Sequence, residues 1–307
     1  MGKNNLTRRQ FVTTLTAGAG TLFLGNIIQA VPVPKILNQA DPFKIITLGK
    51  SRIKTTLLGL GTGFNGGNRS SAITRAGVAE SVISYAYDAG IRFFDCADTY
   101  GTHPYTAKAL KNLPRDKYTL SSKIWVSGGG IPEQERPDAD IVVDRFRKEL
   151  NTDYLDLVQI HCMTSATWSD EQKKQMDILE TLKAKSVIMA HGVSVHSLQA
   201  MEAAAESSWV DVIHVRINPF GAAMDSKDPE KVIPVIKKLH DSGKGVIGMK
   251  LIGNGDFKND SEKIDKSLKY VLGLETVDMI IVGFERPDQI DNYVGRVSNA
   301  LTLLRKK

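Results

Sequence analysis

The stretch "IRFFDCADTYG", residues 91–101, joins a buried-type strand to an abrupt polar end. Ile91, Phe93 and Phe94 are residues of high β-propensity, and Asp95 follows them directly. A carboxylate at the end of a buried strand must be paired or hydrogen-bonded, because burying an unpaired charge is very unfavourable. The stretch therefore predicts a strand that carries Asp95 into a polar site, where another residue pairs with its carboxylate.

The same alternation of strand and helix recurs along the chain. "FKIITLGKSRIKTTLLGLGTG", residues 43–63, predicts a short hairpin and then a first strand at 57–61. Further strand-like runs lie at 91–94, 118–122, 154–160, 187–195, 211–217, 245–249 and 278–282. Helical spacing follows each strand, at residues 77–89, 105–110, 139–150, 171–185, 197–206, 229–240, 261–272 and 287–304. Eight such units predict an α/β protein, a (β/α)8 TIM barrel with a short N-terminal β-hairpin.

A doubly wound dinucleotide-binding sheet is the alternative fold. "GLGTG", residues 59–63, follows a strand, and Asp95 ends the next strand as the ribose-binding acid of such a fold would. However, these glycines lead into "FNGGNRSS" and not directly into a helix. Asp95 also lies 34 residues beyond Gly61, whereas a spacing of about 20 is expected. Both features favour the barrel.

Composition is that of an ordinary globular protein, with 42% hydrophobic and 24% charged residues. The net charge is +6, and it falls to +3 without Lys3, Arg8 and Arg9 of the leader. This balance does not indicate a nucleic-acid partner. The two cysteines, Cys96 and Cys162, form no CxxC pattern, so neither a disulfide framework nor a metal site is predicted.

The first thirty residues predict an export signal. Arg8 and Arg9 precede an uncharged stretch that ends at Ala30, which is the layout of a secretory signal peptide. Paired arginines at this place indicate the twin-arginine type, so we expect the twin-arginine export machinery as a partner and a periplasmic location. If the signal is not used, the protein stays cytoplasmic. The predicted organisation is a signal peptide at 1–30, a Pro-containing linker at 31–42 and one barrel domain at 43–307.

Polar residues end three consecutive predicted strands. After Asp95, the next two strands end in Lys123 within "KYTLSSKIW" and in His161 within "YLDLVQIHCM". The active site of a (β/α)8 barrel lies at the carboxyl ends of its strands, so these side chains should converge, with Lys123 as the partner of Asp95. Tyr100 lies in the loop after the first of them. Alternation along a strand should aim Cys162, the residue after His161, away from this site.

These motifs resemble the aldo-keto reductase superfamily over nearly all of residues 43–307. The resemblance is carried by "LGKSRIKTTLLGLGTG", "GIRFFDCADTYG", "LSSKIW", "YLDLVQIH", "GVSVHS" and "IVGFERPDQIDNYV", which occur in the family's order. It implies a barrel that binds a nicotinamide cofactor and carries a catalytic Asp, Tyr, Lys and His. These four fall on Asp95, Tyr100, Lys123 and His161.

The implied chemistry explains those residue types. Hydride transfer to a carbonyl places negative charge on its oxygen, which must be protonated. Tyr100 is the expected proton donor, and a lysine ammonium beside it should lower the phenol pKa from its usual value of about 10. Asp95 would hold Lys123, and His161 would donate a hydrogen bond to the developing oxyanion.

The cofactor contacts implied by the resemblance are less regular. Ser194 is kept, but Val195 and His214 stand where the family has asparagine and glutamine for the nicotinamide carboxamide. Met249 and Lys250 replace a common Tyr-Ser pair; the Met249 thioether could cover the nicotinamide ring, and Lys250 could meet the pyrophosphate as a point charge. The remaining expected cofactor residues are Gly61, Thr62, Gly253, Arg286 and Gln289. NADP(H) is the favoured cofactor, with NAD(H) as the alternative.

Two function classes follow from the resemblance. The first is an NAD(P)H-dependent oxidoreductase, acting as a monomer on a small or sugar-like aldehyde or ketone, with Trp125 and Trp168 as walls of the substrate pocket. The second is a non-catalytic, cofactor-sensing or ligand-binding protein on the same fold. The four intact catalytic positions favour the enzyme, and the altered carboxamide contacts favour the second class.

Overall fold

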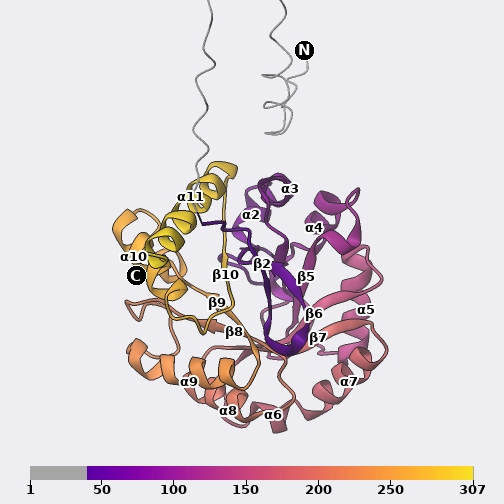
Figure 1. Ribbon diagram of the computed structural model, residues 1–307. Helices are drawn as coiled ribbons and strands as arrows, with labels where there is room; N and C mark the ends of the chain where they lie inside the picture. Colours follow the sequence, from indigo (N-terminus) through magenta and orange to yellow (C-terminus); the bar gives the residue numbers. More distant parts are fainter. Residues whose placement is uncertain (1–39, 307) are drawn as a thin grey trace, which may run out of the picture. The chain divides into compact units, whose positions relative to one another are not determined.

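The structure, a computed structural model, describes residues 40–306. Eight parallel strands close into a barrel in the order β10-β3-β4-β5-β6-β7-β8-β9. They are β3 (Leu58–Gly61), β4 (Phe93–Asp95), β5 (Thr119–Ile124), β6 (Leu155–Met163), β7 (Ile188–Val195), β8 (Val212–Arg216), β9 (Gly245–Met249) and β10 (Met279–Val282). Figure 1 looks along the barrel and shows the helices as an outer ring. The predicted (β/α)8 barrel is confirmed.

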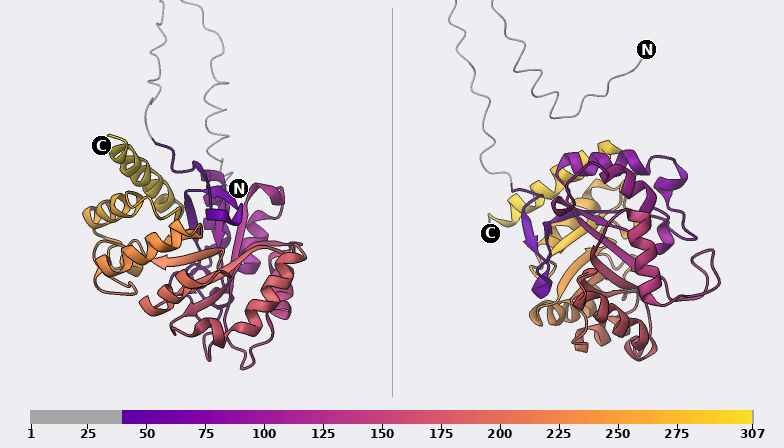
Figure 2. Two further views of the ribbon diagram at one scale, coloured as in Figure 1. Left: turned by 60° about the horizontal axis from the view of Figure 1, so that its bottom comes forward. Right: turned by 90° about the vertical axis from the view of Figure 1, so that its right-hand side faces the viewer.

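A helix follows each strand of the barrel. The helices are α2 (Ala72–Arg75), α3 (Ala79–Ala89), α4 (His103–Leu110), α5 (Ala139–Leu150), α6 (Trp168–Glu171), α7 (Lys173–Ala184), α8 (Leu198–Glu206), α9 (Pro229–Asp241), α10 (Ser261–Leu272) and α11 (Pro287–Leu304). The predicted helix at 171–185 is α7, and the short α6 precedes it, because Gln172 adopts φ −106° and ψ 14° and breaks the helical path between the two. Two further views also show the helices on the outside of the barrel (Figure 2).

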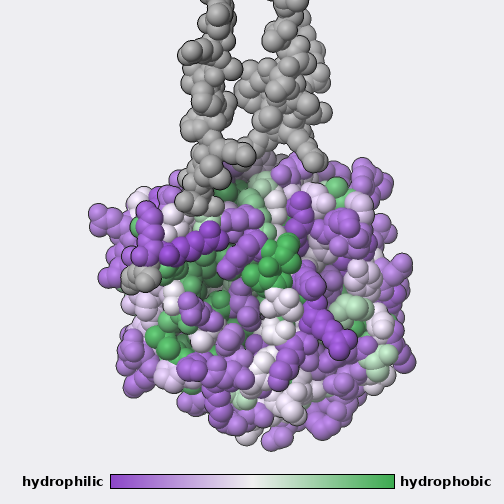
Figure 3. All heavy atoms as spheres, in the orientation of Figure 1, coloured by the Kyte–Doolittle hydropathy of each residue, from purple (hydrophilic) through white to green (hydrophobic). Residues whose placement is uncertain are grey.

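The predicted hairpin closes the amino end of the barrel. Strands β1 (Ile45–Thr47) and β2 (Lys54–Thr56) pair antiparallel, and Leu48 and Ile53 beside them are buried against the barrel interior. Gly49 has φ +48°, and a Cβ there would lie 2.4 Å from the backbone nitrogen of Gly245 at the start of β9. Seen from this end, the surface is mostly hydrophilic, with hydrophobic side chains near its middle (Figure 3). The hairpin therefore covers the amino-terminal end of the barrel, and a ligand-binding site is expected at the carboxyl-terminal end.

Alternation along the strands sorts the barrel interior into an apolar and a polar part. Near the hairpin the interior is filled by apolar side chains from several strands, including Phe93, Leu157, Val212 and Met279. Two residues further along their strands come Asp95, Gln159 and His214, all buried. The same alternation that fills the core thus gathers polar groups at the carboxyl end.

The described domain begins at Ala40, whose N–H donates to Thr302 Oγ1 at 3.2 Å and whose carbonyl accepts from Ser298 Oγ at 2.8 Å. The predicted signal peptide at 1–30 lies outside the described residues, as does the predicted linker at 31–42 except for its last three residues. Between residues 40 and 306, no helix is both long and apolar enough to span a bilayer.

Candidate active site

The partner of the Asp95 carboxylate is Lys123. Lys123 Nζ lies 2.5 Å from Asp95 Oδ1 and also donates to the Cys96 carbonyl at 3.0 Å. Asp95 pairs in register with Ser121 on β5, so Lys123, two residues further, points to the same side of the sheet. Burial alone would raise the pKa of Asp95, but the Lys123 ammonium and His214 hold it below its usual value. Asp95 is thus an ionised carboxylate, and both side chains of the pair are buried.

Tyr100 lies over this ion pair. It ends the 3-10 turn η2 (Asp98–Tyr100) that follows β4, and Lys123 Nζ is 5.3 Å from the centroid of its ring. Burial and the Asp95 charge raise the pKa of the Tyr100 phenol well above its ordinary value. The sequence led us to expect a lowered pKa, but in this structure desolvation and the Asp95 charge raise it instead. The phenol therefore keeps its proton at neutral pH, as a proton donor requires.

Charged side chains from two other units anchor the turn that carries Tyr100. Asp98 is buried and accepts from Arg145 Nη2 of α5 at 2.7 Å and from Arg69 Nε at 3.2 Å. Arg69, in the loop after β3, also donates to Glu133 Oε1 at 2.6 Å. These contacts tie the loops after β3, β4 and β5 together around the phenol. Nothing in the local sequence pattern pointed to Asp98 in this role.

The Tyr100 ring also lies directly against a glycine loop. A Cβ at Gly63 would be 2.2 Å from Tyr100 Cζ, and a Cβ at Gly66 would be 2.7 Å from Tyr100 Cδ1. Real Cβ contacts are never this short, so any side chain at Gly63 must displace the ring. The cluster "GFNGG" after the first strand was the sequence signal for this close approach, although it does not reveal what approaches.

If Tyr100 is the proton donor that the resemblance implies, Gly63→Ala should lower turnover about 100-fold, because a misplacement of a catalytic group by about 1 Å has effects of that size. The matched control is Gly67→Ala in the same loop, where an added Cβ meets nothing within 4 Å. Steady-state kinetics of both variants, with their melting temperatures, check the effect. Equal turnover in the two variants would mean that the loop does not set the position of Tyr100.

His161 meets both Tyr100 and Trp125 at the mouth of the barrel. The His161 ring is edge-on to Tyr100 at 5.7 Å and to Trp125 at 5.4 Å between ring centroids. Burial, with the nearby Lys123 charge, lowers the pKa of His161 well below its usual value, so the imidazole is neutral. A neutral imidazole offers one N–H donor without adding charge to the site.

Cys162 does not point away from the site as alternation predicted. The register of β6 against β7 shifts between Ile160 and Met163, and Cys162 adopts φ +64°. This bulge brings Cys162 Sγ to 3.1 Å from His196 Nδ1, and the His196 ring is edge-on to His161. Burial raises the pKa of the Cys162 thiol to about 11, so it is not a thiolate at neutral pH.

A cavity opens beside these residues. Five of the residues singled out from sequence line it together: Gly61, Asp95, Tyr100, Met249 and Lys250. Lys250 has φ +61° and donates from Nζ to Asn254 Oδ1 at 2.7 Å. Burial, with the nearby Arg216 charge, lowers the pKa of Lys250. The hydrogen-bond partner of the Lys250 amine is thus a neutral amide.

An adjoining cavity continues toward α10 and α11. It is lined by Arg286 and Gln289, among others, and it shares Phe64, Ile252, Gly255 and Gly283 with the first cavity. The two cavities therefore form one groove that runs from Tyr100 to Arg286. Arg286 donates to Asp288 at 2.9 and 3.0 Å, and Gln289 Oε1 accepts from the Glu285 N–H at 2.7 Å.

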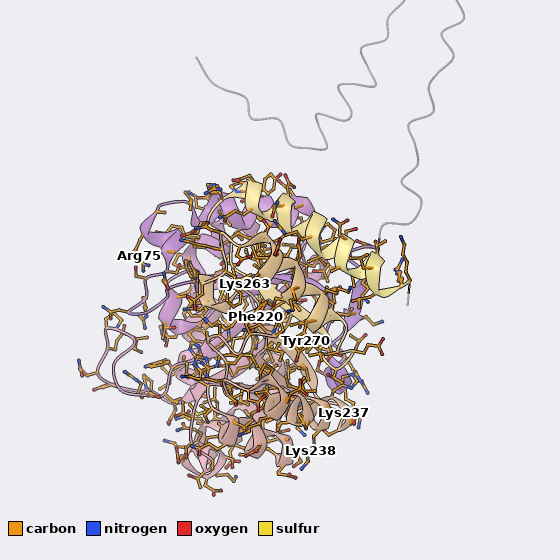
Figure 4. The ribbon with its side chains drawn as sticks, turned by 90° about the vertical axis from the view of Figure 1, so that its left-hand side faces the viewer. Arg75, Phe220, Lys237, Lys238, Lys263 and Tyr270 are labelled. Carbon is orange, nitrogen blue, oxygen red and sulfur yellow. The ribbon has the colours of Figure 1, made fainter. Side chains whose placement is uncertain are left out.

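The loops beside the groove are held by aromatic contacts. Phe220, in the loop after β8, meets Phe257 edge-on with 5.0 Å between ring centroids. Lys263 of α10 lies close to Phe220 (Figure 4), with its Nζ 6.0 Å from that ring and 5.5 Å from the ring of Phe257. These contacts fix the loop after β8 against the loop after β9 and the start of α10.

Eight of the predicted site residues do not line the groove: Lys123, His161 and Trp125, described above, and Thr62, Ser194, Gly253, Trp168 and His214. Thr62 is buried, and its hydroxyl donates to the Asp95 carbonyl at 2.8 Å. Ser194 Oγ accepts from the Cys162 N–H at 2.9 Å and so supports the bulge, while Gly253 is buried beneath the loop after β9. Trp168 is fully buried and donates to the Ala200 carbonyl of α8, so it belongs to the core and not to the substrate pocket. His214 lies inside the barrel against Asp95.

The fold and the site together define a barrel protein with a buried Lys–Asp pair, a tyrosine and a histidine at the carboxyl ends of its strands. The model of the aldo/keto reductase family matches residues 57–269. The chain belongs to this family.

Individual relatives agree with that assignment. The chain is 26% identical over 228 residues to "Probable aldo-keto reductase 1" of Glycine max, covering 71% of this chain and 61% of that protein. It is 33% identical over 120 residues to D-arabinose 1-dehydrogenase of Saccharomyces cerevisiae, covering 38% and 36%. The chain thus spans less than two thirds of the length of these curated relatives. An aldo-keto reductase from Bacillus halodurans in its holo form shares the fold, with a TM-score of 0.65, 20% identity and coverage of 85% and 96%.

Proposed function

We propose that this protein is an NAD(P)H-dependent oxidoreductase that reduces an aldehyde or ketone by hydride transfer, with Tyr100 as the proton donor. The observation that carries the proposal is the position of Tyr100. It lines a groove, lies over the buried Lys123–Asp95 pair and meets His161 edge-on. A protonated phenol, a fixed cation and a neutral donor at one place are the groups that carbonyl reduction needs.

The groove fits a dinucleotide cofactor. It is continuous over two cavities, and Gly61, Gly255 and Gly283 in its lining let a ligand approach the backbone closely. Met249 would lie at the nicotinamide end, beside Tyr100, and Lys250 would meet the pyrophosphate. Arg286 and Gln289 would lie at the adenosine end, near the first turn of α11, where backbone N–H groups favour anions.

Four residues of this chain then have separate roles in the proposed reduction. The bound cofactor supplies a hydride to the carbonyl carbon. Tyr100 donates its phenolic proton to the carbonyl oxygen, and the neutral His161 donates a hydrogen bond that orients the same oxygen. Lys123 stabilises the phenolate that remains until Tyr100 regains a proton, and Asp95 keeps Lys123 in place.

NADP(H) is the proposed cofactor because of the charges that line the adjoining cavity beside α10 and α11. Three cationic residues, Lys258, Arg286 and Arg296, lie there with two acidic residues, Glu285 and Asp288. A 2′-phosphate is favoured by this excess of positive charge. The substrate is proposed to be a small or sugar-like carbonyl compound, bound beside Trp125.

We predict that Lys250→Met weakens NADPH binding by roughly 1–3 kcal/mol, the range for a hydrogen bond to a charged group. Wild-type affinity should also fall as salt rises, with a shallower dependence in the variant. Fluorescence titration with NADPH and NADH at two ionic strengths measures both effects. Equal affinities and equal salt dependences would show that Lys250 does not contact the cofactor.

The direct test of function is an assay of reduced-nicotinamide consumption with a panel of aldehydes, ketones and sugars. Turnover of at least one carbonyl compound is expected. Tight binding of NADPH with no turnover across the panel would instead favour a cofactor-sensing protein. Mass spectrometry of the protein from its native compartment would identify any nucleotide that co-purifies.

For location, we propose export in the folded state through the twin-arginine route, which would let the protein carry a bound cofactor with it. We predict that residues 1–40 direct a reporter to the periplasm and that Arg8→Lys with Arg9→Lys blocks this export, because the receptor reads the arginine pair. Fractionation of cells that express the two reporters measures it. Unchanged export of the double variant would rule out the twin-arginine route.

A further inference from the structure

His214 approaches the catalytic carboxylate from the opposite wall of the barrel. It lies on β8, four strands away from β4 in either direction around the closed barrel. Its Nε2 lies 3.2 Å from Asp95 Oδ1, within ion-pair distance but outside hydrogen-bond geometry, while the same oxygen accepts from Lys123 Nζ at 2.5 Å and from Ser121 Oγ at 3.3 Å. One oxygen of Asp95 is therefore surrounded by three polar groups from β5 and β8.

His214 offers no surface to a ligand in the groove. It is 0% exposed, whereas Asp95 and Tyr100 line the cavity. At the position of His214 the aldo-keto reductase family has a glutamine that binds the nicotinamide carboxamide, so the sequence implied the same contact for His214. The imidazole instead lies beneath the site, toward Asp95, so its effect on a reaction must pass through that carboxylate.

The charge around His214 favours a neutral donor. Burial lowers the pKa of His214, and the Lys123 ammonium acts in the same direction, while Asp95 opposes them. The other titratable groups near Asp95 are Tyr100, Cys96, Lys250 and the neutral His161, while His196, near His214, has its pKa lowered to about 3, mainly by burial. Lys123 already balances the charge of Asp95. A neutral imidazole directed at Asp95 can restrain the carboxylate without adding charge.

We propose that His214 is a positioning residue that fixes the Asp95 carboxylate from across the barrel and so keeps Lys123 in place beneath Tyr100. This inference rests on the proposed function. With Lys123 and Ser121 alone, both from β5, the carboxylate is held from one side. His214 supplies the restraint from the other side, and it does so at a position where the sequence departs from its family.

Two variants test the role of His214. His214→Leu removes the polar group and keeps the side chain apolar and buried, and kcat should fall about 10- to 100-fold, the effect of a misplaced catalytic group. The affinity for NADPH should stay unchanged. His214→Gln keeps a donor and should recover most of kcat. The control is His191→Gln on β7, a buried histidine that stacks on Trp209 and faces Glu180, away from the groove.

The pH profile separates positioning from a general loss of structure. With His214 gone, Asp95 is less stabilised as a carboxylate, so the acidic limb of kcat should move to higher pH in His214→Leu and not in His191→Gln. Unchanged kcat and an unchanged acidic limb in folded His214→Leu would overturn the proposal. So would weaker NADPH binding at unchanged kcat, which would assign His214 to the cofactor.

A measurement without turnover distinguishes this proposal from the proposed function. In wild-type protein labelled with 15N-histidine, the His214 ring signals should show a neutral imidazole and should shift in Asp95→Asn. If the wild type reduces no carbonyl compound but these signals shift, the proposed function fails and the contact stands. Signals that do not respond to Asp95→Asn would overturn the contact itself.

Discussion

Replacing Tyr100 by phenylalanine is expected to lower kcat for carbonyl reduction about 100- to 10,000-fold, the contribution of a positioned general acid. The variant loses one hydroxyl and keeps the ring that lies against Gly63 and Gly66, so the fold should be retained. NADPH affinity should stay near the wild-type value, because the proton is transferred only in the transition state. Single-turnover kinetics and fluorescence titration measure the two effects separately.

The matched control is Tyr105→Phe on α4, a tyrosine 37% exposed to solvent and outside the groove. It should keep wild-type kinetics. Near-normal turnover in Tyr100→Phe would remove the proton-donor assignment, whatever the behaviour of the control. A large loss of NADPH affinity in Tyr100→Phe would show that the phenol serves cofactor binding.

Lys123→Met should abolish turnover and also destabilise the protein. Both Lys123 and Asp95 are nearly inaccessible to solvent, so the variant leaves a buried carboxylate without its cation. Removing one partner of such a pair lowers the free energy of unfolding by about 3–5 kcal/mol. Urea denaturation of the two proteins at neutral pH measures the difference.

The loss of stability in Lys123→Met should depend on pH in a definite direction. In the wild type the pKa of Asp95 is lowered, so its ionisation stabilises the fold above about pH 4 and this contribution is lost as the pH falls. In Lys123→Met, burial should raise the pKa of Asp95, so ionisation destabilises the variant at neutral pH. The gap between the two proteins should therefore shrink in acid.

A double variant checks the same explanation. Asp95→Asn combined with Lys123→Met removes both charges, so it should regain most of the lost stability while turnover stays abolished. A double variant as unstable as Lys123→Met would show that the loss comes from packing around the lysine and not from the unpaired carboxylate.

The sequence predicted those features that depend on local periodicity. The bounds of α5, α10 and α11 match the predicted helices, because an amphipathic repeat and its capping residues lie within one short stretch. The convergence of Asp95, Lys123 and His161 was predictable for a related reason. Parallel strands of a barrel bring their carboxyl ends to one rim whatever the residues between them.

Features set by distant contacts could not be predicted. The orientation of Cys162 depends on a bulge with φ +64° at a residue that is neither glycine nor asparagine. The burial of Trp168 depends on its contact with α8, and the position of His214 depends on the far wall of the barrel. The raised pKa of Tyr100 reflects desolvation and the charge of Asp95, which the spacing of residues along a chain does not report.

The anchoring of the Tyr100 turn has a consequence for protein engineering. Arg69 after β3, Asp98 after β4 and Arg145 of α5 hold that turn jointly, and the glycine loop after β3 shapes the space for the ring. Grafting a foreign loop after β3 or β4 would therefore remove some of the contacts that position the Tyr100 ring. Mutations that aim to change the substrate range should begin in the loop after β6, whose described side chains make none of these contacts. The loops after β3 and β4 should be left unchanged.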